Sequence, residues 1–336
     1  MSAVADRSSL PGESGRAAVR LISLACALSL ALGVTLAGHF LVSSLALERR
    51  LFMHRTVLAR EALAPYQHDM YLVALICQWL QDHAGLTPLH SFTLVFAAGY
   101  LLLFVSLWFC LTSLYRQPAA VLLGLFALAA YACILMPYAF DHPADPFGAA
   151  FVALTLAGAV GRSPAGMLVA AVGAGFFWSK HALVAPIVLL YEGRRGRWLP
   201  GAVRAALVVS AALLGPACYR LPPTAIVAGG ILTPLEWVRS MPLAALYHLG
   251  FALPPLLSLL LRERLHPMVR SAAWLYPLMI VTYAAAGLFI HELRSFWPVV
   301  PVFAVLVAAW GEGVAVVGES GPALDGPEAP DAPARL

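Results

Sequence analysis

Long apolar runs recur along almost the whole chain and constrain its fold more than any other feature. A helix of about 20 apolar residues is long enough to cross the hydrocarbon core of a bilayer. The chain is 61% hydrophobic and 11% charged, whereas a soluble domain averages about 25% charged residues. A porin-type barrel would instead show short segments of alternating hydrophobicity, which this sequence lacks. The sequence therefore predicts an all-α polytopic membrane protein.

We expect about ten transmembrane helices in a membrane domain over residues 21–318. A cytoplasmic N-terminal segment, residues 1–20, precedes this domain, and the Pro- and Ala-rich stretch 319–336 is expected to be a disordered tail. Residues 48–88 mix apolar positions with Arg, His and Glu. They predict two amphipathic helices on the outer membrane surface, divided at Pro65. The expected spans are 21–47, 89–114, 119–138, 146–160, 165–179, 182–192, 202–218, 241–261, 271–290 and 296–316.

Residues 165–192 allow two topologies. They can form one long span with Lys180 buried midway, or two short helices that meet at "WSKH". Each half is too short to cross a full bilayer alone at about 1.5 Å per residue. Short arms are tolerated where the tip is buried in protein or faces a water-filled cavity. We favour the hairpin, which keeps the following "RRGRW" cluster on the side of the N-terminus.

The distribution of arginine predicts the orientation. Ten crossings place both termini on one side, and most of the 21 basic residues then lie on that side as well. Because basic loops stay inside, both termini are expected to be cytoplasmic. The Arg- and Ala-rich composition indicates a bacterial plasma membrane. The arginines lie at the ends of apolar runs, which is not the pattern of a nucleic-acid-binding protein.

In this topology the unusual polar residues fall on the outer face. Ionisable groups at membrane depth are costly, so they usually line a cavity and pair with one another. Each also has an ordinary structural explanation: Asp145 can begin a helix, Glu292 and Arg294 can form an interfacial ion pair, and Lys180 can extend to the membrane surface. The residues expected to gather are His68, Asp69, Asp141, His142, Lys180, His181, His291, Glu292 and Arg294.

No cofactor is clearly indicated by the sequence. Asp141, His142, Asp145, His291 and Glu292 are side chains of the types that bind divalent cations. Their spacing matches no known metal motif, so the sequence leaves open whether a divalent cation binds. A phosphate-binding loop, GxSxG and HExxH are all absent from the sequence.

Four stretches together resemble bacterial polytopic proteins of the GT-C glycosyltransferase type. "YAFDHPADPFGAAFVALTLAGA" (138–159) resembles their aspartate-containing helix start, and "FFWSKHALVAPIVLLYEGRR" (176–195) resembles a basic turn between two short helices. "HELRSFWPVVP" (291–301) is similar to their late E-x-R-x-F-x-P turn, and "REALAPYQHDMY" (60–71) occupies the position of the outer loop that carries the catalytic acid. This chain departs from the family pattern at two points. Those proteins have Glu-Thr after the basic residue of the turn, whereas this chain has His181 and Ala182. They have an acidic pair in the outer loop, whereas this chain has only His68-Asp69.

The resemblance implies transfer of a sugar from a lipid-linked (polyprenyl-phosphate) donor on the non-cytoplasmic face. A carboxylate would act as general base on the acceptor hydroxyl, with Asp69 the first candidate and Asp141 the second. Lys180 and Arg294 would bind the departing phosphate, and His68, His142, His181, His291 and Glu292 would contact substrate or orient these groups. The implied partners are the lipid-linked donor and membrane lipids.

Two other functions stay open. Broken short helices with a basic tip also occur in transporters, so a transporter or flippase of a lipid-linked or anionic substrate is the main alternative. Transporters usually contain an internal repeat, and none is visible in this sequence. A non-catalytic membrane scaffold is the third reading, and it would need none of the converging charges.

Overall fold

The computed structural model describes residues 13–41, 44–59, 71–139, 144–161, 163–177, 179–219, 256, 265–285 and 293–316. These residues are helical almost throughout and contain no strand, which confirms the all-α prediction. The elements are α1 (Glu13–Leu41), α2 (Ser44–Leu58), α3 (Tyr71–Ala84), α4 (Pro88–Leu114), α5 (Pro118–Ala139), α6 (Asp145–Val160), α7 (Pro164–Phe177), η3 (Ser179–Val184), α8 (Ala185–Arg194), α9 (Trp198–Ala212), α10 (Leu214–Tyr219), α13 (Pro267–Ala272), α14 (Leu275–Ala285), η4 (Leu293–Val299) and α15 (Val300–Val316).

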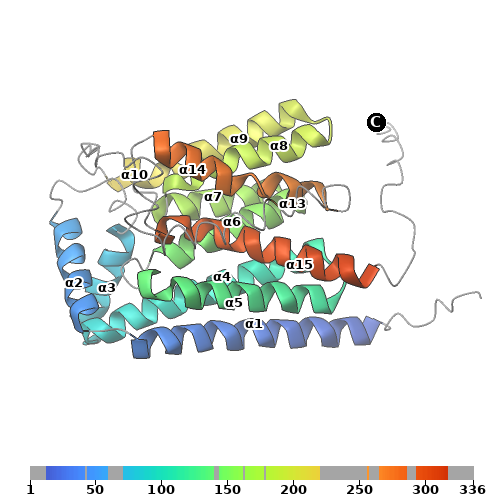
Figure 1. Ribbon diagram of the computed structural model, residues 1–336. Helices are drawn as coiled ribbons and strands as arrows, with labels where there is room; N and C mark the ends of the chain where they lie inside the picture. Colours follow the sequence, from blue (N-terminus) through green and yellow to red (C-terminus); the bar gives the residue numbers. More distant parts are fainter. Residues whose placement is uncertain are drawn as a thin grey trace, which may run out of the picture.

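The long helices run side by side in one bundle, and α2 stands across one end of it (Figure 1). We call this the α2 end. The opposite end of the bundle contains the start of α1, the end of α15 and the turn between α8 and α9 (Figure 1). We call this the arginine end, because that turn carries the "RRGR" sequence of residues 194–197.

Small residues let the central helices approach closely, as is common where apolar helices pack in membranes. Helix α4 packs against both α1 and α6. A Cβ atom at Gly99 of α4 would lie 3.0 Å from the Phe147 ring of α6. Hydrogen bonds also join α4 to its neighbours: Trp108 donates from Nε1 to Ser23 Oγ of α1 at 2.9 Å, and Tyr115, the C-cap of α4, donates to the Val305 carbonyl of α15 at 2.8 Å.

Two of the described helices are long and apolar enough to cross a membrane, Ala17–Leu41 and Pro88–Leu114. Other apolar helices, among them Asp145–Val160, Pro164–Phe177 and Trp198–Ala212, are shorter. The ten-span topology therefore stays a prediction, and the expected span 241–261 lies outside the described residues except for residue 256.

The chain reverses direction at "WSKH", as the hairpin interpretation predicts. Helix α7 ends at Phe177, and the 3₁₀ turn η3 leads into α8. Gly175, near the end of α7, lies against the carbonyls of Ala211 and Ala212, near the end of α9. Pro164 and Met167, at the start of α7, lie beside Arg204 in the first half of α9, so α7 and α9 run parallel. Because α8 and α9 form a tight antiparallel pair, α8 must run opposite to α7.

Several boundaries differ from the predictions, and two of the differences have a clear cause. The expected span 202–218 is interrupted at Leu213, and the span 271–290 is interrupted at residues 273–274. Pro216 and Pro277 follow these breaks. Proline has no N–H to donate to the carbonyl one turn earlier, so the helix is interrupted just before it. Helix α1 also begins at Glu13, inside the expected N-terminal segment, and ends at Leu41 rather than residue 47.

Candidate functional site

Three segments that carry predicted site residues meet within the bundle. Helix α6 starts at Asp145, just after the "FDHPA" stretch, while η3 carries Lys180 and His181, and η4 carries Arg294. Both η3 and η4 pack against α6. Helix α3, which lies within the predicted surface segment 48–88, packs against α4 and α7 close by. Segments separated by more than 100 residues in the sequence thus lie together, although not every side chain in them is described.

The structure places the predicted residues to different extents. Lys180 lies in η3 and Arg294 in η4, but their side chains are outside what the structure describes. Only His181 is described with its side chain. The predicted residues that lie wholly outside the described part of the chain are His68, Asp69, Asp141, His142, His291 and Glu292.

His181 holds η3 against α6. The ring is fully buried, and its Nε2 lies 3.0 Å from Oγ1 of Thr155. That hydroxyl donates its own proton to the Phe151 carbonyl at 2.8 Å, so the histidine must donate to Thr155 from Nε2. His181 therefore positions the turn that contains Lys180. A direct contact of His181 with substrate stays a prediction.

Asp145 lies in a polar and aromatic corner between α4, α6 and η4. The N-cap position of α6 is Ala144, so Asp145 stands one residue inside the helix, directly before Pro146. Its carboxylate is close enough to Tyr100 for electrostatic interaction. The Tyr100 ring meets the Trp297 ring of η4 edge to face, with 6.0 Å between centroids. Trp297 is fully buried, and among the described residues its Nε1 has no hydrogen-bond partner.

Arg50 was not among the predicted site residues, although it is a deeply buried charge among the described residues at the α2 end. Arg50 is 1% exposed. Its guanidinium carbon lies 5.0 Å from the centroid of the Phe92 ring and 5.2 Å from that of Phe96, within the range of cation–π attraction. A charge buried on a helix predicted to lie at the membrane surface is costly, which suggests a functional role. The only sequence signal was its position four residues before His54, on the same face of α2.

His54 is held neutral beside Arg50. Its ring is 5% exposed and meets Phe92 edge to face at 4.7 Å. Burial, reinforced by the Arg50 charge, lowers the pKa of His54 to about 3. Burial likewise raises the pKa of the nearby Cys77 thiol to about 12, although the Arg50 charge opposes this shift. At neutral pH, Arg50 is therefore the one charged member of this group of three.

No three His, Cys, Asp or Glu side chains form a metal-binding group within the part of the chain that the structure describes. Four of the predicted ligands, Asp141, His142, His291 and Glu292, lie outside that part. A divalent cation at the α2 end therefore stays open.

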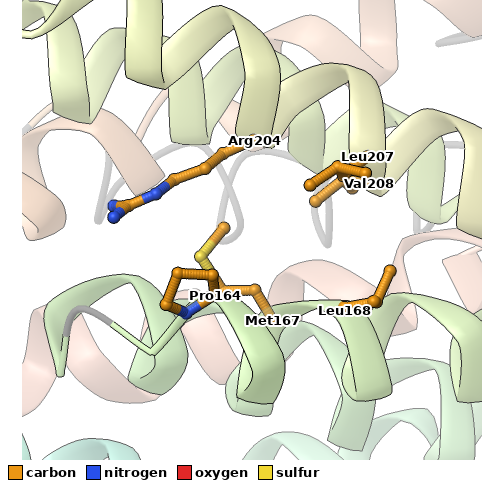
Figure 2. Close-up of a pocket in the computed structure, with 6 residues that line it drawn as sticks. All are labelled: Pro164, Met167, Leu168, Arg204, Leu207 and Val208. Carbon is orange, nitrogen blue, oxygen red and sulfur yellow. The ribbon is translucent and has the colours of Figure 1, made fainter.

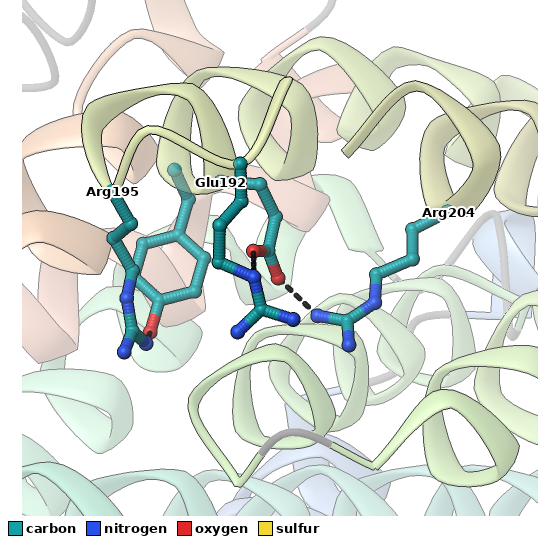
Figure 3. A network of polar contacts seen from close by, with 5 residues as sticks. Glu192, Arg195 and Arg204 are labelled. Carbon is teal, nitrogen blue, oxygen red and sulfur yellow. Dashed lines mark hydrogen bonds and ion pairs between the residues drawn. The ribbon is translucent and has the colours of Figure 1, made fainter. Parts of the chain in front are cut away.

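A second polar group lies at the arginine end (Figure 3). Glu192, 1% exposed at the end of α8, pairs with Arg204 of α9 and lies 3.5 Å from Nε of Arg197. Arg195 donates to the Tyr191 hydroxyl at 2.9 Å. His266, the N-cap of α13, faces the Tyr191 ring, and burial together with Arg195 and Arg270 lowers its pKa. This group joins the α8–α9 hairpin to α13.

In comparisons with known proteins, no family model, curated protein or solved structure matches this chain.

Proposed function

We propose that this protein is a polytopic membrane enzyme of the GT-C type, which transfers a sugar from a lipid-linked donor at its α2 end. The observation that carries the proposal is the packing of η3 and η4 on α6, which draws together the segments of three resembling motifs. The buried Arg50 adds a fixed positive charge at the same end. In the proposed orientation the α2 end faces away from the cytoplasm.

A membrane location is supported by the outer surface of the bundle. Besides the two long apolar helices, large apolar side chains are exposed on several helices, including Leu32, Phe40, Phe109, Phe126 and Val169. Exposed apolar surface on this scale is a sign of contact with lipid or with a partner. Lipid contact explains why it extends over helices on different parts of the bundle.

The proposed reaction assigns each charge a task. Asp69 or Asp141 takes the proton of the acceptor hydroxyl as its oxygen bonds to the anomeric carbon of the sugar. The bond from that carbon to the donor phosphate breaks, and the lipid phosphate leaves with the electron pair. Arg294 and Lys180 stabilise the negative charge that develops on this phosphate. Lipid tails of donor and product remain in the bilayer throughout.

The test is turnover by purified protein supplied with a polyprenyl-phosphate sugar. We expect Asp69→Asn or Asp141→Asn to lower turnover by about 100-fold or more, because a general base contributes at least that factor. Asp82→Asn is the matched control, since Asp82 is an exposed carboxylate of α3 that accepts a hydrogen bond from Gln78, one turn earlier in the same helix. Unchanged turnover in both Asp69→Asn and Asp141→Asn would remove the assigned base.

A transporter or flippase is the competing function, because transporters also contain short broken helices such as those at the 3₁₀ turns η3 and η4. Reconstituted vesicles separate the two functions. Movement of a labelled lipid-linked substrate across the bilayer, with no new glycosidic bond, would establish transport in place of transfer. Mass spectrometry of copurifying lipids would show whether a polyprenyl phosphate is the bound species.

A further inference from the structure

A shallow groove runs between the start of α7 and the middle of α9, at the arginine end. Its lining is apolar except for one side chain: Pro164, Met167, Leu168, Leu207 and Val208 line it together with Arg204. Figure 2 shows the Arg204 guanidinium at one end of the groove, above Pro164, with Leu168, Leu207 and Val208 towards the other. The groove therefore has a charged end near the bundle terminus and an apolar end farther along the helices.

The charged end has an excess of positive charge. Arg204 and Arg197 share the single buried carboxylate of Glu192, so two arginines face one acid. Arg197 remains 38% exposed and can still accept a second anionic partner. Arg194, exposed at the end of α8, adds to the positive potential. An anion at this end would complement the uncompensated charge.

The surroundings of the groove are suited to hydrocarbon. Leu168 is 41% exposed and Leu207 43% exposed on its two walls. Trp198 and Leu199, at the start of α9, are also exposed. The Trp198 ring lies over Gly193, where an added Cβ would come within 2.5 Å of it. A tryptophan at the start of a helix with exposed apolar side chains, close to arginines, is typical of the membrane interface.

We infer that this groove binds one anionic phospholipid, with its phosphate at Arg197 and Arg204 and an acyl chain against Leu168 and Leu207. The direction of the groove fits this ligand, because the phosphate lies at the bundle terminus and the chain extends alongside the helices. Arginine binds phosphate oxygens through paired N–H donors. Anionic lipids are drawn to basic segments at the cytoplasmic membrane surface. This site is separate from the proposed reaction at the opposite end of the bundle.

The test is native mass spectrometry of the full chain in detergent, with added phosphatidylglycerol or phosphatidylcholine of identical acyl chains. We expect one phosphatidylglycerol to remain bound under conditions that remove phosphatidylcholine. Arg197→Gln should reduce the retained phosphatidylglycerol about fivefold, the effect of one arginine near a lipid surface. Leu207→Trp should reduce it as well without changing any charge, because the indole would fill the groove.

Arg116→Gln is the matched control, since Arg116 is an exposed arginine in the turn between α4 and α5. Retention by this variant should equal that of the unaltered chain. Equal retention of the two lipids, or wild-type retention by both groove variants, would overturn the inference. An equal loss in Arg116→Gln would indicate diffuse surface charge instead. Displacement of the lipid by soluble glycerol 3-phosphate would assign the site to a soluble anion.

Discussion

Replacing Gly215 with alanine is expected to destabilise the bundle by about 3 kcal/mol, the upper part of the range for overpacked sites. A Cβ atom at Gly215 would lie 1.8 Å from the carbonyl oxygen of Gly175 and 2.4 Å from its carbonyl carbon. Both atoms belong to the backbone, so no side-chain rotation can relieve the clash. Helices α7 and α10 would have to separate, and the packing of α7 on α9 would be disturbed with them.

Thermal unfolding of the purified protein in detergent measures this effect. The midpoint of Gly215→Ala should fall by on the order of 5 °C. Gly33→Ala is the control, because Gly33 lies in α1 and an added Cβ would meet nothing within 4 Å. Alanine favours a helix over glycine by about 1 kcal/mol, so this variant should be as stable as the original or slightly more so. Equal midpoints for Gly215→Ala and the unaltered protein would show that α7 and α10 do not touch in this way.

Arg204→Gln is expected to lower the free energy of unfolding by about 3 kcal/mol. Glu192 is 1% exposed, and Arg204 is its hydrogen-bonded partner across the α8–α9 hairpin (Figure 3). Removing one member of a buried ion pair leaves the other charge without compensation in a poorly hydrated place, which typically costs 3 kcal/mol or somewhat more. Arg197, at 3.5 Å from the same carboxylate and more exposed, compensates only in part.

Two further variants make the Arg204 result specific. Arg194→Gln should leave the unfolding midpoint unchanged, because Arg194 is exposed and surface charges contribute little to stability. The double variant Arg204→Gln, Glu192→Gln should recover most of the loss, since it leaves no buried charge. A double variant as unstable as Arg204→Gln would show that the guanidinium stabilises the protein through packing rather than through Glu192.

The sequence was informative wherever a local pattern decides the structure. The length and polarity of residues 165–192 favoured the reversal at "WSKH" over one long span, and the division of residues 48–88 predicted α2 and α3 on either side of Pro65. The helix breaks before Pro216 and Pro277 were also accessible, because proline removes a backbone donor at a known position. The spans 202–218 and 271–290 were nevertheless predicted as unbroken helices, because each run is apolar over most of its length.

The burial of individual charges could not be predicted in the same way. Arg50 resembled any other basic residue of a surface helix, and its burial depends on Phe92 and Phe96, which belong to another helix. The pairing of Glu192 with Arg204 depends on how tightly the α8–α9 turn closes. For the candidate site, the sequence predicted that the segments with Lys180, Asp145 and Arg294 lie together, and η3 and η4 each pack on α6. Which of their charges meet is a question of side-chain geometry that no spacing rule decides.

The proposed reaction and the inferred lipid site both require that the two ends of the bundle face opposite sides of a membrane. Single cysteines test this directly, with a membrane-impermeant maleimide applied to intact spheroplasts and then to lysed cells. Suitable positions are Asp82→Cys in α3, near the α2 end, and Arg194→Cys at the arginine end, both exposed. Labelling is measured above that of the unaltered chain, which has five free cysteines.

We expect Asp82→Cys to be labelled in intact spheroplasts and Arg194→Cys to be labelled only after lysis. Labelling of both positions in intact spheroplasts, or labelling of Arg194→Cys alone, would contradict the orientation on which the proposed function depends.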